Sequence, residues 1–218
     1  MEKDVTVLIP TYYGNYMLTT CISSLMKASS GVKILLYKND VGWLQACNEL
    51  MAAVQTDVIL LNDDTIIISD ILQSMRNMAY SADSIGIVGG KALSLDENTI
   101  INYGIYVGPD GNTAHRYYGQ PRASVKAERQ QAVEGSCIYI KREVLDKVGY
   151  FDTAYGLGYR EEVDLAFRAR EAGYQVVSTP EAEYIHLVSQ TNGPLNIKND
   201  TFDIFMERWG TKLRQGRV

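Results

Sequence analysis

Two neighbouring carboxylates, Asp63 and Asp64, follow a short apolar run in the sequence Leu60-Leu61-Asn62-Asp63-Asp64-Thr65. Like charges placed so close repel each other, and a divalent cation relieves that repulsion. Carboxylate oxygens are hard ligands that suit Mg²⁺ or Mn²⁺, and these ions also bind diphosphates. The same residue types commonly end a strand in an exposed turn and cap the next helix. The pattern therefore leaves two interpretations open, a metal site and a turn.

A second acidic group, Glu161-Glu162-Val163-Asp164, opens a predicted helix and follows the sequence Gly156-Leu157-Gly158-Tyr159. The helix dipole favours acidic residues in a first turn, and this alone explains their presence. A loop with glycines that brings a carboxylate to a helix N-terminus could also present an ionised general base. Taken by itself, the motif favours the structural explanation.

The chain has two histidines, His115 and His186. His186 ends a predicted strand that follows Pro180, where a single histidine is more often a hydrogen-bonded structural residue than a metal ligand. His115 lies in a segment rich in tyrosine, among them Tyr117 and Tyr118. Such rings could stack on a sugar, although burial of the ring is the commoner arrangement.

The composition narrows the class of protein. The 218 residues are 46% hydrophobic and 22% charged, which excludes a disordered chain and a coiled coil. A net charge of −5 without a basic cluster argues against a nucleic-acid partner. Three cysteines without a CxxC spacing (Cys21, Cys47 and Cys137) indicate neither a disulfide framework nor a zinc site, and favour a reducing compartment. With no signal peptide and no apolar run near the roughly 18 residues of a membrane span, we expect a soluble, cytoplasmic protein.

The hydrophobic periodicity predicts an alternation of strands and helices. Strands are predicted at 5–10, 32–37, 58–61, 85–88 and 137–140, and helices at 43–54, 142–148, 161–172 and 202–213, with two more beginning after Asn15 and after Ser69 or Asp70. Short strands and a mobile loop are expected over 91–133. The alternation predicts an α/β fold with a mostly parallel, Rossmann-like sheet and helices on both faces. Ligands bind at the carboxyl ends of such strands, where Thr11, Asp40 and Asp64 fall.

The order of the motifs along the chain is more specific than any one of them. It runs through Pro10-Thr11-Tyr12, Asn39-Asp40-Val41-Gly42, Asn62-Asp63-Asp64, Gly135-Ser136-Cys137, Gly149-Tyr150-Phe151-Asp152, Glu161-Glu162-Val163-Asp164 and finally His186. This succession closely resembles the family 2 glycosyltransferases with the GT-A fold, in particular the bacterial and viral rhamnosyltransferase-like branch. The resemblance extends from about residue 5 to residue 209. It implies a single domain over 1–218, with 1–90 binding a nucleotide sugar and 91–218 providing acceptor-binding and catalytic groups.

The resemblance also implies a role for individual residues. The nucleotide and the donor sugar would be bordered by Pro10, Thr11, Tyr12, Asn39, Asp40, Gly42, Gln45, Asn48, Asn62 and Asp63. Asp64 and His186 would hold Mn²⁺ or Mg²⁺. Gly135, Ser136 and Cys137 would border the acceptor. Glu162 would be the general base, with Glu161 as its main competitor and Asp164 as a weaker one.

The resemblance implies inverting transfer from a nucleotide-diphosphate sugar to a hydroxyl of a carbohydrate, lipid-linked or protein acceptor. Three positions depart from the family: the passage Lys38-Asn39-Asp40 is short, Asn62 replaces the first carboxylate of the DXD element, and Glu162 replaces an aspartate. The last change leaves open a catalytically silent sugar- or nucleotide-binding protein. A sugar nucleotidyltransferase is a further alternative, although residues 10–14 are not a glycine-rich, basic phosphate loop. A dehydrogenase is disfavoured because GxGxxG is missing after the first strand.

Overall fold

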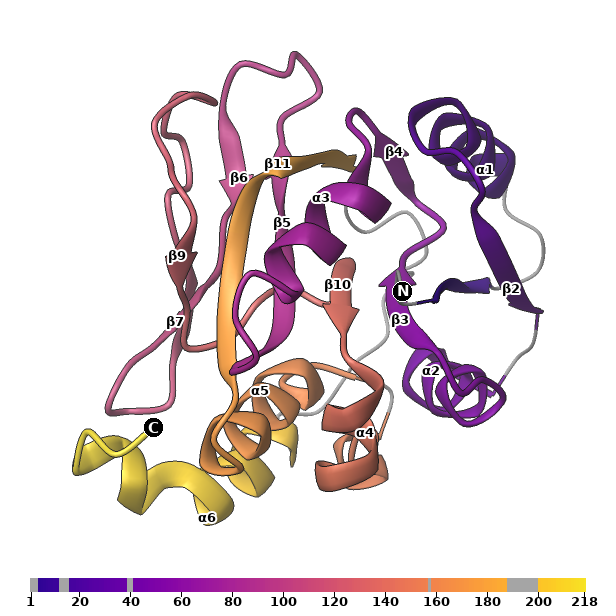
Figure 1. Ribbon diagram of the computed structural model, residues 1–218. Helices are drawn as coiled ribbons and strands as arrows, with labels where there is room; N and C mark the ends of the chain where they lie inside the picture. Colours follow the sequence, from indigo (N-terminus) through magenta and orange to yellow (C-terminus); the bar gives the residue numbers. More distant parts are fainter. Residues whose placement is uncertain (1–3, 12–15, 39–40, 157, 188–199) are drawn as a thin grey trace.

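The centre of the protein is a nine-stranded mixed sheet (Figure 1). The structure is a computed structural model that describes residues 4–11, 16–38, 41–156, 158–187 and 200–218. The strands of the main path follow the order β2 (Lys33–Lys38), β1 (Val5–Thr11), β3 (Asp57–Leu61), β10 (Cys137–Ile140), β5 (Ile85–Leu93), β11 (Gln175–His186) and β4 (Thr65–Ile67). β2, β1 and β3 are parallel to one another, as are β5 and β11.

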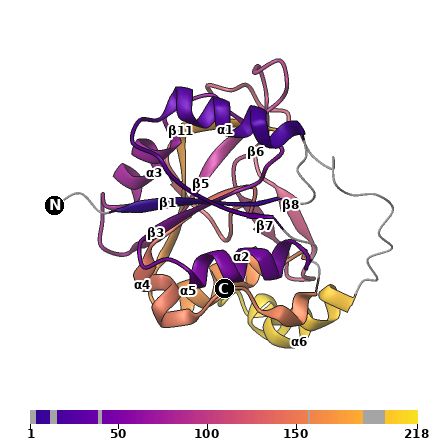
Figure 2. The ribbon, with the colours of Figure 1, turned by 90° about the vertical axis from the view of Figure 1, so that its right-hand side faces the viewer.

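Helices cover both faces of the sheet (Figure 2). One face carries α1 (Tyr16–Ala28) and α3 (Ile71–Ala79), and the other carries α2 (Trp43–Ala52), α4 (Arg142–Val148), α5 (Glu161–Glu171) and α6 (Asp200–Arg214). Side chains alternate between the faces along each strand. In β3, Val58 and Leu60 pack with the α2, α5 and α6 side, whereas Ile59 and Leu61 pack with the α1 and α3 side. This two-sided burial explains why the residues of β3 from Val58 to Leu61 are all apolar.

The central strand β10 runs antiparallel to both of its neighbours, β3 and β5. Its first residue, Cys137, is opposite Leu61, the last residue of β3. The residues just before β10 therefore lie at the same edge of the sheet as the residues just after β3. This pairing brings Glu134 and Gly135 to the turn that holds Asp63 and Asp64.

The long strand β11 reaches the same edge from the other side. Its end pairs antiparallel with β4, so that His186 is opposite Thr65. The backbone N–H of Leu187 then donates to the carbonyl oxygen of Asp64 over 3.0 Å. His186 is thereby fixed beside the turn after β3.

Shorter elements complete the structure away from this edge. β6 (Ile100–Asn102) pairs with β5, and β9 (Glu128–Arg129) pairs with β11. β7 (Ile105–Val107) and β8 (Thr113–His115) form a separate hairpin. A short 3₁₀ helix, η1 (Thr153–Tyr155), precedes α5.

The predicted α/β class, the mostly parallel sheet and the helices on both faces are confirmed. Two details differ. The sequence prediction ends a strand before Gly89, yet β5 continues to Leu93. A Cβ atom on Gly89 would lie only 2.5 Å from a methyl carbon of Val133, so this glycine permits close packing inside a strand. The three-residue strand β4 is not predicted because its pairing partner, β11, is distant in sequence.

No helix within the described part of the chain is long and apolar enough to cross a membrane.

Candidate active site

The turn after β3 is held by contacts from three other elements. The indole Nε1 of Trp43 donates to Oδ1 of Asn62 over 2.9 Å, and the backbone N–H of Asn62 donates to the carbonyl oxygen of Ser136 over 2.9 Å. The hydroxyl of Thr11 donates to Oδ2 of Asp63 over 2.7 Å. Thr11 and Asp63 thus meet at the carboxyl ends of β1 and β3, the edge at which the sequence predicts ligand binding.

Asp64, Glu134 and His186 form a connected group at this edge. Nε2 of His186 is 3.3 Å from Oδ1 of Asp64, and its Nδ1 is 2.9 Å from Oε1 of Glu134. The imidazole is largely buried, with 10% of its side-chain surface exposed. Burial alone would lower the pKa of His186, but the contacts with the two carboxylates raise it to about 9. The ring is therefore oriented by Glu134 and directed at Asp64.

The donor atoms of this group fit a divalent cation. Oδ1 of Asp64 is buried, and beyond its ion pair with Nε2 of His186 it accepts no hydrogen bond among the described residues. A buried carboxylate oxygen beside an imidazole nitrogen is a pair of ligands of the kind that Mn²⁺ accepts. No group of three or more His, Cys, Asp or Glu side chains arranged for a metal occurs in the described part of the chain. The pair therefore suits an ion that keeps water and substrate phosphate oxygens as its other ligands.

The first turn of α5 carries two glutamates whose carboxyl groups interact with each other and whose other neighbours differ. Glu162 lies beside Gly135, since a Cβ on that glycine would be 3.8 Å from Cβ of Glu162. Glu161 is buried under the loop at Gly158, and its charge acts on the buried thiol of Cys47. Of the two, Glu162 is the one that lies next to the edge formed by Glu134 and Gly135.

Both glutamates hold protons more tightly than a solvated carboxylate. Burial first, and then the charge of Glu134, raise the pKa of Glu162 to about 7, although Arg160 opposes the increase. Burial and the charge of Glu162 raise the pKa of Glu161 well above its usual range. One oxygen of each carboxylate is buried without a hydrogen-bond partner among the described residues. A carboxylate that titrates near neutral pH is suited to accept a proton.

The third acidic residue of this turn, Asp164, is completely paired. It is 0% exposed and accepts hydrogen bonds from Nε of Arg168, Nη1 of Arg208 and Nε1 of Trp209 over 2.7, 2.8 and 2.8 Å. The hydroxyl of Tyr155 is a further donor at 3.3 Å. Asp164 thus ties α5 to α6 and η1 and has no free oxygen for chemistry.

The loop that leads into α5 adopts an unusual backbone. Gly158, Tyr159 and Arg160 have φ angles of 131°, 74° and 77°. Two successive non-glycine residues in the left-handed region cost about 1–3 kcal/mol each. Arg160 donates from Nη1 to the carbonyl oxygen of Gly111 over 2.6 Å, and its guanidinium lies 4.9 Å from the ring centre of Phe202. These contacts hold the loop that presents Glu162.

The remaining residues predicted to border the donor are placed as follows. Pro10 is buried in β1, and Gly42, with a φ angle of 93°, precedes the first residue of α2. Gln45 is exposed and donates to Oε1 of Glu49 over 3.0 Å. The side-chain amide of Asn48 donates to the carbonyl of Phe151 and accepts from its N–H, which fixes the loop after α4. Tyr12, Asn39 and Asp40 lie outside the described residues.

The residues predicted to border the acceptor are all buried. Ser136 and the hydroxyl of Tyr184 are joined by a hydrogen bond of 2.9 Å. Cys137 belongs to β10 and, like Cys21 and Cys47, is a buried free thiol. Gly135 lies beside the side chain of Glu162, and an acceptor role for Gly135, Ser136 and Cys137 stays a prediction.

Two residues of the site were not predicted from the sequence, Glu134 and Trp43. Trp43 donates to Asn62, stacks on Phe151 at a centroid distance of 5.6 Å and packs beside Gly135. An acidic residue just before a fully apolar strand was the available signal for Glu134. It became informative only once the direction of β10 was known.

Comparisons with known proteins give the family and the fold of this chain. Residues 32–211 match the family described as glycosyltransferase like family 2. The chain belongs to this family. Two solved glycosyltransferase structures have the same fold, which is the GT-A fold predicted from the sequence.

The first structure is GalNAc-T7 with UDP, GalNAc and Mn²⁺, with a TM-score of 0.75 at 12% identity over 99% of this chain and 50% of that one. The second is the mannosyltransferase PcManGT from Pyrobaculum calidifontis in complex with GDP-Man and Mn²⁺. Its TM-score is 0.61 at 14% identity, over 88% of this chain and 59% of that one. At these identities the likeness concerns the fold.

Two curated relatives are similar in sequence. An uncharacterized protein, y4gI, from Sinorhizobium fredii is 27% identical over an alignment of 210 residues. The alignment covers 86% of this chain and 23% of the relative. The N-acetylglucosaminyl-diphospho-decaprenol L-rhamnosyltransferase of Mycobacterium tuberculosis is 34% identical over 76 residues, 35% of this chain and 24% of the relative. The chain thus spans about a quarter of the length of the curated relatives it matches.

Proposed function

We propose that this chain is a metal-dependent, inverting glycosyltransferase that moves a sugar from a nucleotide-diphosphate sugar to an acceptor hydroxyl. The observation that carries the proposal is the juxtaposition at one sheet edge of a ligand pair, Asp64 and His186, with a carboxylate of raised pKa, Glu162. The first suits a cation that binds a diphosphate, and the second suits the removal of a proton from an acceptor. An enzyme of this class needs both functions.

The cation, Mn²⁺ or Mg²⁺, would be held by Asp64 and His186 and would supply charge neutralisation for the departing diphosphate. Mn²⁺ accompanies the nucleotide or nucleotide sugar in both structural relatives. Glu134 keeps Nδ1 of His186 occupied, which leaves Nε2 directed at Asp64. An oriented imidazole of this kind is the usual arrangement of a metal-binding histidine.

The donor nucleotide would lie along the carboxyl ends of β1 and β3. Thr11 already holds Asp63 in place through a hydrogen bond of 2.7 Å, and Trp43 holds Asn62. These contacts fix the turn before any ligand binds, so that little ordering is needed on binding. The predicted contacts of Tyr12, Asn39 and Asp40 with the base belong to the same proposal.

Glu162 would act as the general base. Inversion is a single displacement, so that the acceptor oxygen attacks the anomeric carbon while its proton leaves to a carboxylate on the face opposite the diphosphate. Glu162 has a buried oxygen without a described partner and a pKa near neutrality. Glu162 lies beside Gly135 and is affected by the charge of Glu134, whereas Glu161 is buried at Gly158, which supports Glu162 over its neighbour.

The acceptor is proposed to be a carbohydrate, lipid-linked or protein hydroxyl. The mycobacterial relative is named for an acceptor in which the sugar is linked to decaprenol by a diphosphate. A nucleic-acid acceptor is disfavoured by the net charge of −5. The three free cysteines support a reducing compartment, for which we propose the cytoplasm.

The test is the release of nucleoside diphosphate from UDP-, GDP-, dTDP- and CDP-sugars, with Mn²⁺, with Mg²⁺ and with excess EDTA. We expect turnover with one donor, loss of turnover in EDTA, and loss of turnover in Asp64→Asn. Asp70→Asn is the matched control, because this half-buried carboxylate caps α3 and is not part of the group formed by Asp64, Glu134 and His186. Full activity in EDTA or in Asp64→Asn would refute the metal-dependent mechanism. A chain that binds a donor and never releases nucleoside diphosphate would be the catalytically silent alternative.

A further inference from the structure

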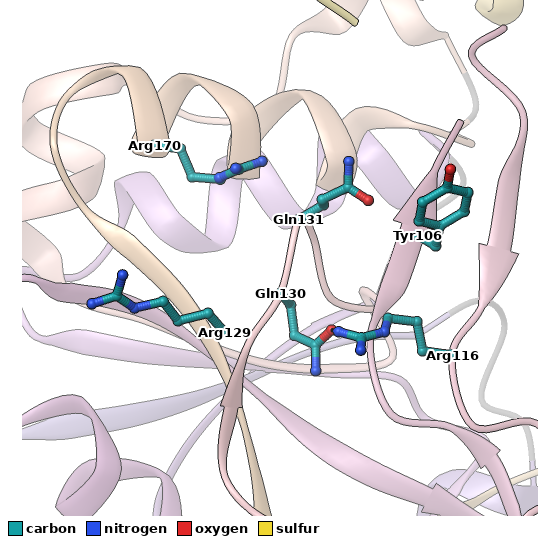
Figure 3. A pocket seen from close by; sticks show the side chains of 6 residues that line it. All are labelled: Tyr106, Arg116, Arg129, Gln130, Gln131 and Arg170. Atoms are coloured by element: carbon teal, nitrogen blue, oxygen red, sulfur yellow. Dashed lines mark hydrogen bonds between the residues drawn. The ribbon is translucent and has the colours of Figure 1, made fainter. Parts of the chain in front are cut away.

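A polar cavity lies away from the acidic edge, between the hairpin β7–β8, strand β9 and the end of α5 (Figure 3). Its volume is about 320 Å³, and it is lined by Tyr106, Arg116, Arg129, Gln130, Gln131 and Arg170. A water molecule occupies about 30 Å³ of liquid, so the cavity has room for a multi-atom group. Three of the six lining side chains are guanidinium groups, and none is acidic.

Among the residues that line the cavity, Arg170 has a buried N–H group, at Nη1, without a hydrogen-bond acceptor in the described part of the chain. Arg168, two residues earlier on the same helix, donates to Asp164 and to the carbonyl oxygens of Val148 and Tyr150. Burial lowers the pKa of Arg170, as expected of a cation without a nearby counter-charge. A role at the helix C-terminus explains a basic residue in this turn, but it does not explain a buried, unpaired N–H group.

The other two guanidinium groups leave a positive surplus. The side chain of Arg129 is exposed on β9, and among the described residues it makes no hydrogen bond or ion pair. Arg116 donates to Oε1 of Gln130 over 2.7 Å and lies 3.5 Å from Oε1 of Glu128. One carboxylate therefore faces three arginines, which leaves two positive charges uncompensated.

The two glutamines form a fixed wall of the cavity. The side-chain amide of Gln131 bonds to both the N–H and the carbonyl of Val107, and Nε2 of Gln130 donates to the carbonyl of Tyr103. Figure 3 shows Arg170 and Arg116 extending toward these glutamines from opposite sides. The glutamine side chains are held by these hydrogen bonds, so the arginines are the groups available to bind an anion.

We propose that this cavity is a binding site for a phosphoryl group, a phosphate or a diphosphate, that is separate from the donor site. The fork of a guanidinium matches two oxygens of a phosphate, and two surplus charges match a diphosphate diester. The site is about 12 Å along α5 from Glu162, because Arg170 is eight residues further on a helix with a rise of 1.5 Å. It does not depend on the proposed transferase activity, and either can fail without the other.

The test is isothermal titration calorimetry of the full chain, in EDTA and low salt, with three probes: inorganic phosphate, inorganic diphosphate and a short prenyl diphosphate. We expect binding that weakens as salt is added and that is at least about tenfold weaker in Arg170→Gln and in Arg129→Gln, since a charged hydrogen bond is lost. Arg217→Gln, which removes an exposed arginine elsewhere, is the matched control. Asp64→Asn separates this cavity from the donor edge and should bind the probes as the unsubstituted chain does.

The outcomes also identify the source of the phosphoryl group. Tighter binding of the prenyl diphosphate supports a phosphoryl group carried by a larger ligand, and equal binding of the inorganic ions supports a free phosphate or diphosphate. The proposal is overturned if none of the probes binds at millimolar concentration. It is also overturned if the two arginine variants bind as tightly as Arg217→Gln, or if acetate binds as well as diphosphate.

Discussion

The first turn of α5 contains two kinds of carboxylate within four residues. Asp164 is completely buried and accepts hydrogen bonds from two arginines and a tryptophan, so its charge is balanced by its partners. Glu162 has a buried oxygen without a described partner, and its pKa is raised to about 7. Neither burial nor negative charge distinguishes the two residues. The difference is whether the fold supplies hydrogen-bond donors to the carboxylate. Asp164 has such donors and holds helices together, whereas Glu162 keeps an oxygen available for chemistry.

The largest expected effect tests the chemical side of this comparison. Glu162→Gln should reduce kcat by about 10²–10⁴, the usual contribution of a positioned base. The Kd for the donor should change little, because the base contacts the acceptor. Glu162→Asp should retain activity, since it keeps a carboxylate and is the residue that the family resemblance implies at this position. Steady-state kinetics and donor titration measure both quantities.

The control for this experiment is the neighbouring residue. Glu161→Gln should keep most of the activity because Glu161 is buried at Gly158, whereas Glu162 lies beside Gly135. A dead Glu161→Gln together with a fully active Glu162→Gln would show that the base has been assigned to the wrong glutamate.

The second effect tests the structural side. Asp164→Asn should lower the free energy of unfolding by about 2–3 kcal/mol, because charged hydrogen bonds to Arg168 and Arg208 are lost. The kcat of the folded protein should remain close to that of the unsubstituted chain. Urea unfolding followed by circular dichroism gives the first quantity. If Asp164→Asn lost activity without losing stability, the two carboxylates would not differ as described.

A third effect concerns Glu134, which orients His186. Glu134→Ala should raise the Mn²⁺ concentration needed for half-maximal activity about 10–100-fold, the usual cost of losing the partner of a metal-binding histidine. Glu134→Gln retains an acceptor for Nδ1 and should recover most of this loss. Activity measured across a Mn²⁺ titration distinguishes the three proteins. An unchanged Mn²⁺ requirement in Glu134→Ala would remove Glu134 from the proposed site.

The smallest effect is on stability as a function of pH. The pKa of Glu162 is raised from 4.5 to about 7 on folding, so the folded state binds more protons than the unfolded state between these values. The free energy of unfolding should therefore fall as the pH rises from about 4.5 to about 7. Glu162→Gln removes this penalty and should therefore be more stable than the unsubstituted chain above pH 7. Thermal denaturation in EDTA, without donor, measures the difference, and an equal pH dependence in both proteins would contradict it.

The sequence was sufficient for much of the fold and part of the site. Apolar periodicity located β1, β3, α2 and α5 to within a few residues, because their burial repeats locally along the chain. The acidic turn at Asp63 and Asp64 was recognised because it directly follows a buried strand. The contact of His186 with Asp64 followed from the family resemblance, since β11 and β4 pair across more than a hundred residues of sequence.

The rest of the site depends on contacts that no local pattern encodes. Glu134 reaches the edge only because β10 runs against both of its neighbours. The partners that neutralise Asp164, Arg208 and Trp209, come from α6, so the sequence could not tell this carboxylate from Glu162. The direction of a strand and the identity of a distant donor are both tertiary properties.

The antiparallel insertion of β10 also has a consequence for how the chain folds. β3 and β5 are synthesised well before β10, and each must keep one edge open until Cys137–Ile140 arrives between them. Pairings over such long separations in sequence slow folding, because the loop entropy is lost before the contacts form. During that interval the apolar strand Val58-Ile59-Leu60-Leu61 presents unpaired backbone groups, the arrangement that favours association between chains. The strand that completes the acidic edge is therefore also the one that protects the folding chain from aggregation.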